Sequence, residues 1–246
     1  MALTIRSSVV AALAATLLLS GCATNAEPPA VADGTAAARE DFRMTDPSAP
    51  PLADPDGTLL AAAAAGDAAQ VSLALRAGAA IEARDDHQRT ALLLAAAADH
   101  VEVAKVLVAA GADPDALDDR HDTPWLVTGV TGSVPMLEVL LPAEPDLTIR
   151  NRFGGVSVIP ASERGHVEYV RRVVETGIDV NHVNDLGWTA LLEAVILGDG
   201  GSRHQEIVRI LLDAGADPSI GDHDGVTALE HARSRGYVEL ARILGG

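Results

Sequence analysis

"VLVAAGADPDALD", at residues 106–118, is one of five related segments in this chain. The other four are LALRAGAAIEARD (73–85), VLLPAEPDLTIRN (139–151), RVVETGIDVNHVN (172–184) and ILLDAGADPSIGD (210–222). The first position of the motif's "GAD" segment recurs at steps of 33, 33, 33 and 38 residues, at Gly78, Gly111, Glu144, Gly177 and Gly215. A fixed period near 33 residues indicates a solenoid built from repeated units.

The residues between these segments follow the same period. Each unit has a polar turn, an alanine-rich run, a short break and a second apolar run. A threonine at the end of the turn can cap a helix with its hydroxyl, and we expect this of Thr90, Thr123, Thr189 and Thr227. The pattern predicts two helices and one projecting turn per unit. The six units begin near Gly57, Asp85, Asp118, Asn151, Asn184 and Asp222.

The period, the turn, the threonine, a "GH"-type break (at His100, His166 and His204) and the "GAD" segment together resemble the ankyrin repeat over residues 57–246. The resemblance implies an all-α ankyrin-repeat solenoid of about six stacked helix–turn–helix units with short projecting turns. The first and last units would be caps. The family's TPLH motif lacks its histidine here, so we expect packing to replace that residue's hydrogen bonds. The positions concerned are Leu93, Leu126, Ile159, Leu192 and Glu230.

The third unit departs most from the pattern. Glu144 stands where the other units have glycine, and Pro142 interrupts the end of the second helix. Gly129 and Gly132 lie in or near the first helix of the same unit. A side chain held in the left-handed backbone region costs about 1–2 kcal/mol. We therefore expect a weak joint at this unit.

The amino-terminal stretch ATLLLSGCATNAEPPA, at residues 15–30, contains the only cysteine of the chain, Cys22. Arg6 precedes an apolar run from about Val9 to Leu19, which is shorter than the roughly 20 residues that a membrane-spanning helix needs. The run and its small-residue end are typical of a secretory signal. The segment LSGC resembles the lipobox of bacterial lipoproteins, which implies cleavage before Cys22 and its acylation. The alternative is an ordinary signal with an accidental cysteine.

These features predict three regions: a lipoprotein signal peptide at 1–21, a lipidated cysteine with a flexible linker rich in proline and alanine at 22–56, and the repeat domain at 57–246. Acyl chains at Cys22 would hold the protein to a membrane durably. Ala23 after the cysteine favours the periplasmic face of the outer membrane. In a cell with a single membrane, the anchor would lie on the extracytoplasmic face of the plasma membrane.

Composition restricts the function. The net charge is -17 and no basic stripe is present, so a nucleic-acid partner is not expected. Histidines are spread along the array and catalytic motifs are absent, so we expect no metal, no cofactor and no enzyme activity. One alternative is a small hydrolytic or metal-dependent enzyme using Glu193 and His231, which share a register in consecutive units. The simpler interpretation of that pair is a polar contact. A structural spacer without a partner is a further alternative.

The resemblance also implies a binding surface, the concave face formed by the turn tips and the first helices. Tip positions in units four and five are Arg152, Phe153, Asp185, Leu186 and Trp188. First-helix positions and the glycine-rich insertion at 198–204 add Glu163, Arg164, Ile196, Leu197 and Arg203. Aromatic residues flanked by arginine are typical of interaction hot spots. We expect a monomer that binds an envelope protein through these residues and contacts the membrane only through its lipid.

Overall fold

The computed structural model describes residues 52–246. The predicted signal peptide, Cys22 and the linker through residue 51 lie outside the described residues. Within residues 52–246 the helices form six consecutive pairs, as the repeat pattern predicts. The first three pairs are α1 (Pro55–Ala65) with α2 (Ala68–Arg76), α3 (Ala91–Ala97) with α4 (Val101–Ala109), and α5 (Pro124–Thr131) with α6 (Val134–Leu140). The last three are α7 (Val158–Glu163) with α8 (Val167–Val173), α9 (Ala190–Ile196) with α10 (Ser202–Asp213), and α11 (Ala228–Ser234) with α12 (Val238–Ile243).

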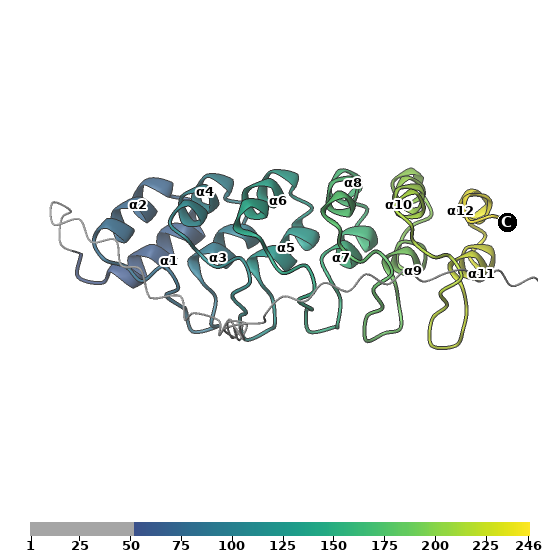
Figure 1. The fold of residues 1–246 in the computed structure, drawn as a ribbon, viewed down its shortest axis with the longest axis horizontal. Coiled ribbons are helices and arrows are strands. Elements are labelled where there is room, and N and C mark those ends of the chain that lie inside the picture. Colours follow the sequence, from purple (N-terminus) through teal and green to yellow (C-terminus); the bar gives the residue numbers. More distant parts are fainter. Residues whose placement is uncertain (1–51) are drawn as a thin grey trace, which may run out of the picture. The chain divides into compact units, whose positions relative to one another are not determined.

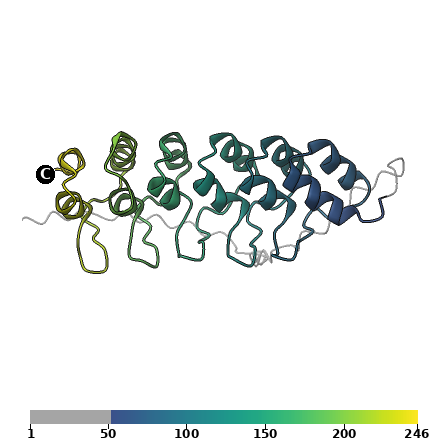
Figure 2. The same cartoon turned by 180° about the vertical axis from the view of Figure 1, so that it is seen from behind.

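The helices lie in two layers (Figure 1). The first helices of the pairs have odd numbers and pack in sequence order in one layer. The second helices have even numbers and pack in the same way in the other layer. The turns between pairs project from the layer of first helices, and the same arrangement is seen from behind in Figure 2. One continuous apolar core, made mainly of aliphatic side chains with Trp125 and Tyr169 among them, runs between the layers. The fold is therefore the predicted all-α ankyrin-repeat stack, and each pair buries its apolar faces only against its neighbours.

Each projecting turn is held by its first residue, an aspartate or asparagine. In the fourth unit, Asn151 Oδ1 accepts hydrogen bonds from the backbone N–H groups of Phe153 (2.9 Å) and Gly155 (3.0 Å). Such Asx turns fix the backbone without tertiary support. Four other residues accept the same two bonds at the same spacing: Asp85, Asp118, Asn184 and Asp222.

The four predicted threonine caps are confirmed. The hydroxyl of Thr123, for example, accepts a hydrogen bond from the backbone N–H of Leu126 at 3.0 Å, and the other three make the equivalent bond. Packing replaces the missing histidine at the four apolar positions, which are buried. The sixth unit differs, because Glu230 is exposed and its carboxylate accepts a bond from the Thr227 N–H at 2.8 Å, completing a capping box.

Consecutive pairs are also joined through a ring near the start of the second helix. His166 Nε2 lies 3.1 Å from the carbonyl oxygen of Val130 in the preceding unit. A Cβ atom at Gly132, which has a φ of 71°, would lie 2.4 Å from the His166 ring. The glycine therefore leaves space for the ring. Equivalent hydrogen bonds join His100 to Ala64, His204 to Glu163, and Tyr237 to Gly198.

The interface between the second and third units lacks this contact. Ser133 replaces the ring and instead caps α6, accepting a bond from the Met136 N–H at 3.2 Å. At the equivalent position of the second unit, the left-handed residue is Asp99, with a φ of 56°, in place of the glycine found at the five other breaks. The residue types at equivalent positions therefore vary together. Where the preceding unit has a glycine, the next unit has a ring, and where it has Asp99, the next unit has Ser133.

The third unit shows the predicted strain at its carboxyl end. Glu144 has a φ of 54° and a ψ of 57°, and α6 ends in a 3-10 turn over Leu141–Ala143 that contains Pro142. Gly129, by contrast, serves close packing, because a Cβ there would lie 2.0 Å from the Ser157 carbonyl oxygen. That glycine brings α5 against the fourth unit rather than loosening the joint.

Two boundaries differ from expectation. Helix α1 begins at Pro55, two residues before the predicted start of the repeat domain at 57, because Asp54 caps it by accepting a bond from the Gly57 N–H at 2.9 Å. The glycine-rich insertion at 198–204 is not loop throughout, because its last residues, from Ser202, form the amino-terminal end of α10. Of the helices in residues 52–246, none is both long and apolar enough to span a membrane.

We predict that Glu144→Gly stabilises the protein. Removing the side chain relieves about 1–2 kcal/mol of left-handed strain, and the greater freedom of glycine in the unfolded chain offsets about 0.5–1 kcal/mol of it. The net gain, about 0.5–1 kcal/mol, should raise the Tm by about 1–4 °C. Calorimetry should show this shift for Glu144→Gly and not for the control Glu144→Ala, which removes the carboxylate but keeps a Cβ. Equal Tm values for the two variants would contradict the strain.

Candidate functional site

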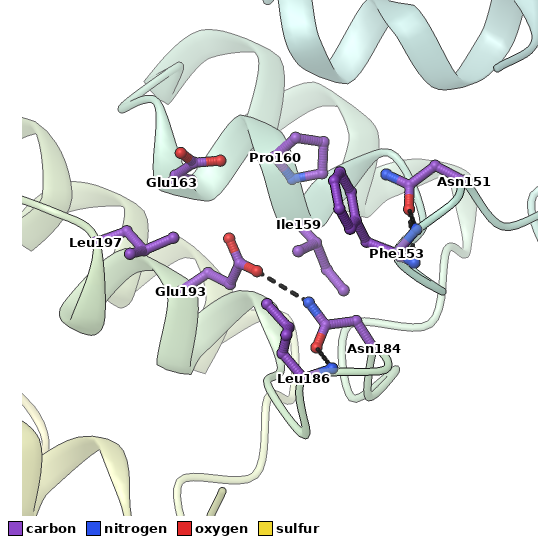
Figure 3. Close-up of a pocket in the computed structure, with 10 residues that line it drawn as sticks. Asn151, Phe153, Ile159, Pro160, Glu163, Asn184, Leu186, Glu193 and Leu197 are labelled. Carbon is purple, nitrogen blue, oxygen red and sulfur yellow. Dashed lines mark hydrogen bonds between the residues drawn. The ribbon is translucent and has the colours of Figure 1, made fainter. Parts of the chain in front are cut away.

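A pocket of about 170 Å³ lies between the fourth and fifth units, on the side of the turn tips and first helices. The tips beginning at Asn151 and Asn184 form one side, and α7 and α9 form the other (Figure 3). Its walls are largely apolar, and two glutamates supply the acidic groups. The lining residues are Asn151, Phe153, Gly155, Ile159, Pro160, Glu163, Asn184, Leu186, Glu193 and Leu197.

The turn tips hold two apolar side chains at the mouth of the pocket. Phe153 is 51% exposed and Leu186 is 48% exposed. The backbone of each is fixed, because its N–H donates to the asparagine that starts the same tip. The two tips are also joined, since the Asp185 N–H donates to the Phe153 carbonyl oxygen at 2.9 Å. The exposed side chains are therefore presented by rigid backbone.

Arg152 extends the aromatic side of the pocket. Its guanidinium lies 4.5 Å from the centroid of the Phe153 ring, a cation–π contact. The same guanidinium is 3.6 Å from Asp122 Oδ2 in the preceding tip. Arg152 thereby packs against the Phe153 ring, and its charge is paired with that of Asp122.

Glu193 places a carboxyl group at the floor of the pocket. Its residue is only 5% exposed, and its Oε1 accepts a hydrogen bond from Asn184 Nδ2 at 2.9 Å. Burial disfavours the charged carboxylate, and the nearby negative charge of Glu163 adds to this effect. Together they raise the pKa of Glu193 to about 7, against the smaller opposing effect of the Asn184 bond. This carboxyl group can therefore gain or lose a proton near neutral pH.

The structure brings four of the predicted binding residues together at the pocket: Phe153, Glu163, Leu186 and Leu197. Arg152 adjoins them. The exposed residues Arg164, Asp185 and Arg203 do not line the pocket.

Two predicted positions differ in exposure. Ile196 was wrongly expected on the surface; it is 8% exposed and belongs to the core, because α9 is buried on nearly all sides. Trp188, expected to be exposed, is half-buried and packs against the core.

Sequence reasoning missed Asn151, Ile159, Pro160 and Asn184 as lining residues, and it considered Glu193 for catalysis or for a polar contact with His231, not for binding. A signal for Glu193 existed in the spacing. Asn184 and Glu193 are nine residues apart and bonded, and Asp222 and His231 repeat the same spacing and bond in the last unit.

This spacing also bears on the enzyme alternative. Glu193 bonds to Asn184, and His231 Nε2 lies 2.8 Å from Asp222 Oδ2, so each side chain is engaged within its own unit. The expected contact between Glu193 and His231 is thus replaced by two separate pairs. Within residues 52–246, no group of three or more histidine, cysteine or acidic residues is arranged to hold a metal ion.

We predict that Glu193→Gln removes a pH-dependent loss of stability. A carboxyl group with a pKa near 7 in the fold and 4.5 in the unfolded chain binds more protons when folded, so stability falls as the pH rises through that window. After allowance for partial solvent screening, the variant should exceed the native chain by about 1–2 kcal/mol at pH 8. At pH 5 the two should match. Urea unfolding at both pH values measures this, and a pH-independent difference would refute the buried titration.

Comparisons with known proteins agree with this architecture. The family model described as "Ankyrin repeats (3 copies)" matches residues 35–118, 125–222 and 161–245. The putative ankyrin repeat protein YahD of Escherichia coli is 50% identical over 104 residues, which are 42% of this chain and 52% of YahD. The human mitochondrial disaggregase is 36% identical over 84 residues, 34% of this chain and 11% of that protein. This chain thus spans about half the length of YahD and much less of the disaggregase.

Solved structures extend the likeness to most of the chain. A crystallised ankyrin repeat domain from Acinetobacter baumannii is 48% identical, has a TM-score of 0.73, and covers 76% of this chain and 95% of its own. The ankyrin repeat protein EF0377 is 38% identical with a TM-score of 0.74, and covers 77% of this chain and 96% of its own. Ankyrin repeats generally mediate protein–protein interaction and are typically not enzymes. By repeat period, fold and sequence match, the chain belongs to the ankyrin-repeat family.

Proposed function

We propose that this protein is a lipid-anchored binding module that recognises a protein partner through the tips and first helices of its fourth and fifth units. The observation that carries the proposal is the cluster of exposed apolar side chains around the pocket. Phe153, Leu186 and Leu197 are each about half exposed, at 51%, 48% and 49%. Clustered apolar exposure on a soluble domain marks an interaction surface, whereas scattered exposure does not.

The rigidity of this surface supports the same proposal. Ordering a flexible loop on binding costs free energy, and a surface that is already fixed avoids that cost. Both tips are held by their asparagines and by the bond from Asp185 to Phe153. A spacer without a partner has no need of exposed aromatic and aliphatic groups presented in this way. We therefore prefer the binding function over the spacer and over the enzyme.

The lipobox-like segment ending at Cys22 supports the proposed location. An acylated Cys22 would place the repeats on the periplasmic face of the outer membrane, or outside the plasma membrane of a single-membrane cell. The partner would then be an envelope protein, recognised by a monomer of this chain.

We predict that the double variant Phe153→Ala with Leu186→Ala loses its partner. Each side chain is placed as a hot spot, and losing two hot spots should lower capture about tenfold or more. The measurement is crosslinking in the native envelope followed by quantitative mass spectrometry. The control is Val238→Ala, which removes an apolar side chain that is 81% exposed but lies on α12. Capture that is unchanged in the double variant, or equally reduced in the control, would place the site elsewhere.

We predict that Cys22→Ser releases the protein from the membrane. Without the thiol no acyl chains can be attached, and the acyl chains provide the anchoring free energy. When cells that express the full chain are fractionated, the native protein should be found with the membranes. The Cys22→Ser variant should be found in the soluble fraction or as an uncleaved precursor. Metabolic labelling with a fatty-acid analogue should mark only the native chain. A labelled Cys22→Ser variant would contradict the anchor.

A further inference from the structure

The pocket between the fourth and fifth units combines two chemically different surfaces. Phe153, Leu186 and Ile159 supply apolar walls, while Glu163 and Glu193 supply carboxyl groups from two neighbouring helices. Figure 3 shows the carboxyl group of Glu193 pointing into the pocket, with Glu163 and Leu197 on one side of it and Phe153 and Pro160 on the other. A ligand that fills this pocket must therefore be apolar along part of its length and able to donate hydrogen bonds at its end.

One oxygen of Glu193 is available for such a ligand. Oε1 is bonded to Asn184, and Oε2 has no hydrogen-bond partner among residues 52–246. Glu193 as a residue is only 5% exposed, but Oε2 is not among the fully enclosed side-chain atoms that lack a partner, so it is reachable from the cavity. The unused oxygen faces the cavity, where a donor from another molecule would satisfy it.

The charged groups around Glu193 do not neutralise it. Glu163 on α7 is the charged neighbour that acts on it, and its charge is of the same sign. On α10, His204 lies 2.7 Å from Asp199 Oδ1 and 2.9 Å from the Glu163 carbonyl oxygen. On α11, His231 is bonded to Asp222. Arg164 follows α7 and is exposed. Neither Glu163 nor Glu193 forms an ion pair within the described part of the chain.

The size of the pocket limits the occupant. A cavity of about 170 Å³ is smaller than the roughly 300–1,000 Å³ of sites that enclose whole small molecules. It suits a single long side chain that enters from a larger partner. Lysine and arginine both have an apolar stem and a cationic end. Arginine fits better, because its planar, weakly hydrated guanidinium carries five donors and can reach two carboxyl groups at once.

We infer that this pocket receives an arginine side chain of the protein partner, with its stem against Phe153 and Leu186 and its guanidinium at Glu193 Oε2 and Glu163. This inference rests on the proposed binding function and names the partner's chemistry. The net charge of -17 favours the approach of a basic surface, since electrostatic complementarity speeds encounter.

Proton linkage follows from this arrangement. An arginine at Oε2 favours the ionised form of Glu193, so binding below about pH 7 releases a proton from it. Affinity should then rise as the pH increases from 5 to 7, by up to about tenfold per pH unit, and level off above. Glu193→Gln should abolish this dependence, because an amide does not titrate in this range.

The test uses the full chain and small probes observed by NMR chemical-shift titration. N-acetyl-arginine amide should bind with shifts at the pocket, and N-acetyl-citrulline amide, its neutral isostere, should bind about tenfold more weakly. The lysine analogue should fall between them. Glu193→Gln and Glu163→Gln should each weaken arginine binding about tenfold, while Glu102→Gln, an exposed glutamate of α4, should not. The spectrum of each variant in the absence of probe shows whether the stack is intact.

Two results would overturn the inference: equal affinity for the arginine and citrulline probes, or arginine affinity and pH dependence unchanged in Glu193→Gln. In the second case the pH dependence would arise outside Glu193. These outcomes are separable from the proposed function. If partner capture depends on Phe153 and Leu186 but is unaffected by Glu193→Gln, the proposed binding face stands and the inference of a bound arginine fails. If the native chain captures no partner at all, the proposed function itself fails.

Discussion

The stack depends most on a contact that recurs at three of its five interfaces, a ring laid over a left-handed glycine of the preceding unit. His100, His166 and Tyr237 each lie against a glycine whose missing Cβ leaves room for the ring, and each bonds to the carbonyl two residues before that glycine. The contact satisfies a carbonyl at the end of a first helix, which would otherwise lack a partner. Where it occurs, it also limits how closely consecutive pairs approach.

The candidate site follows from the stacking of the fourth and fifth units, where His204 Nε2 lies 2.9 Å from the Glu163 carbonyl oxygen. A single unit offers one tip and one first helix, which together make no cavity. When the fourth and fifth units stack, the tips at 151–155 and 184–188 lie side by side, and Pro160 of α7 approaches Glu193 of α9 across the same pocket. Because the contact is between units, each unit can vary its own tip and helix residues without disturbing the fold. Binding specificity in such a stack therefore resides in which residues occupy equivalent positions of two neighbours.

Most of the fold could be predicted because its causes are local and periodic. The steps of the "GAD" position, the threonine caps and the strain at Glu144 all depend on backbone conformations that a few residue types favour. The site was harder, since it depends on exposure and on pairs that form across the turn. Ile196 is periodic with surface positions but lies in a helix buried on nearly all sides, and the bond between Asn184 and Glu193 has no motif. The insertion at 198–204 was also hard to predict, because its glycine-rich start is typical of a loop while its end forms the first residues of helix α10.

The most direct test of the central contact compares two glycines that share a left-handed backbone. Gly132 has a φ of 71° and faces the His166 ring, whereas Gly177 has a φ of 85° and has nothing within 4 Å of the added Cβ. Alanine at either position strains the backbone by about 1–2 kcal/mol, but only at Gly132 does it also displace a ring, which adds about 1–3 kcal/mol. Urea unfolding should therefore show Gly132→Ala to be clearly the less stable variant, and His166→Ala should abolish that excess. Equal destabilisation by the two alanines, or an excess that survives His166→Ala, would contradict the account.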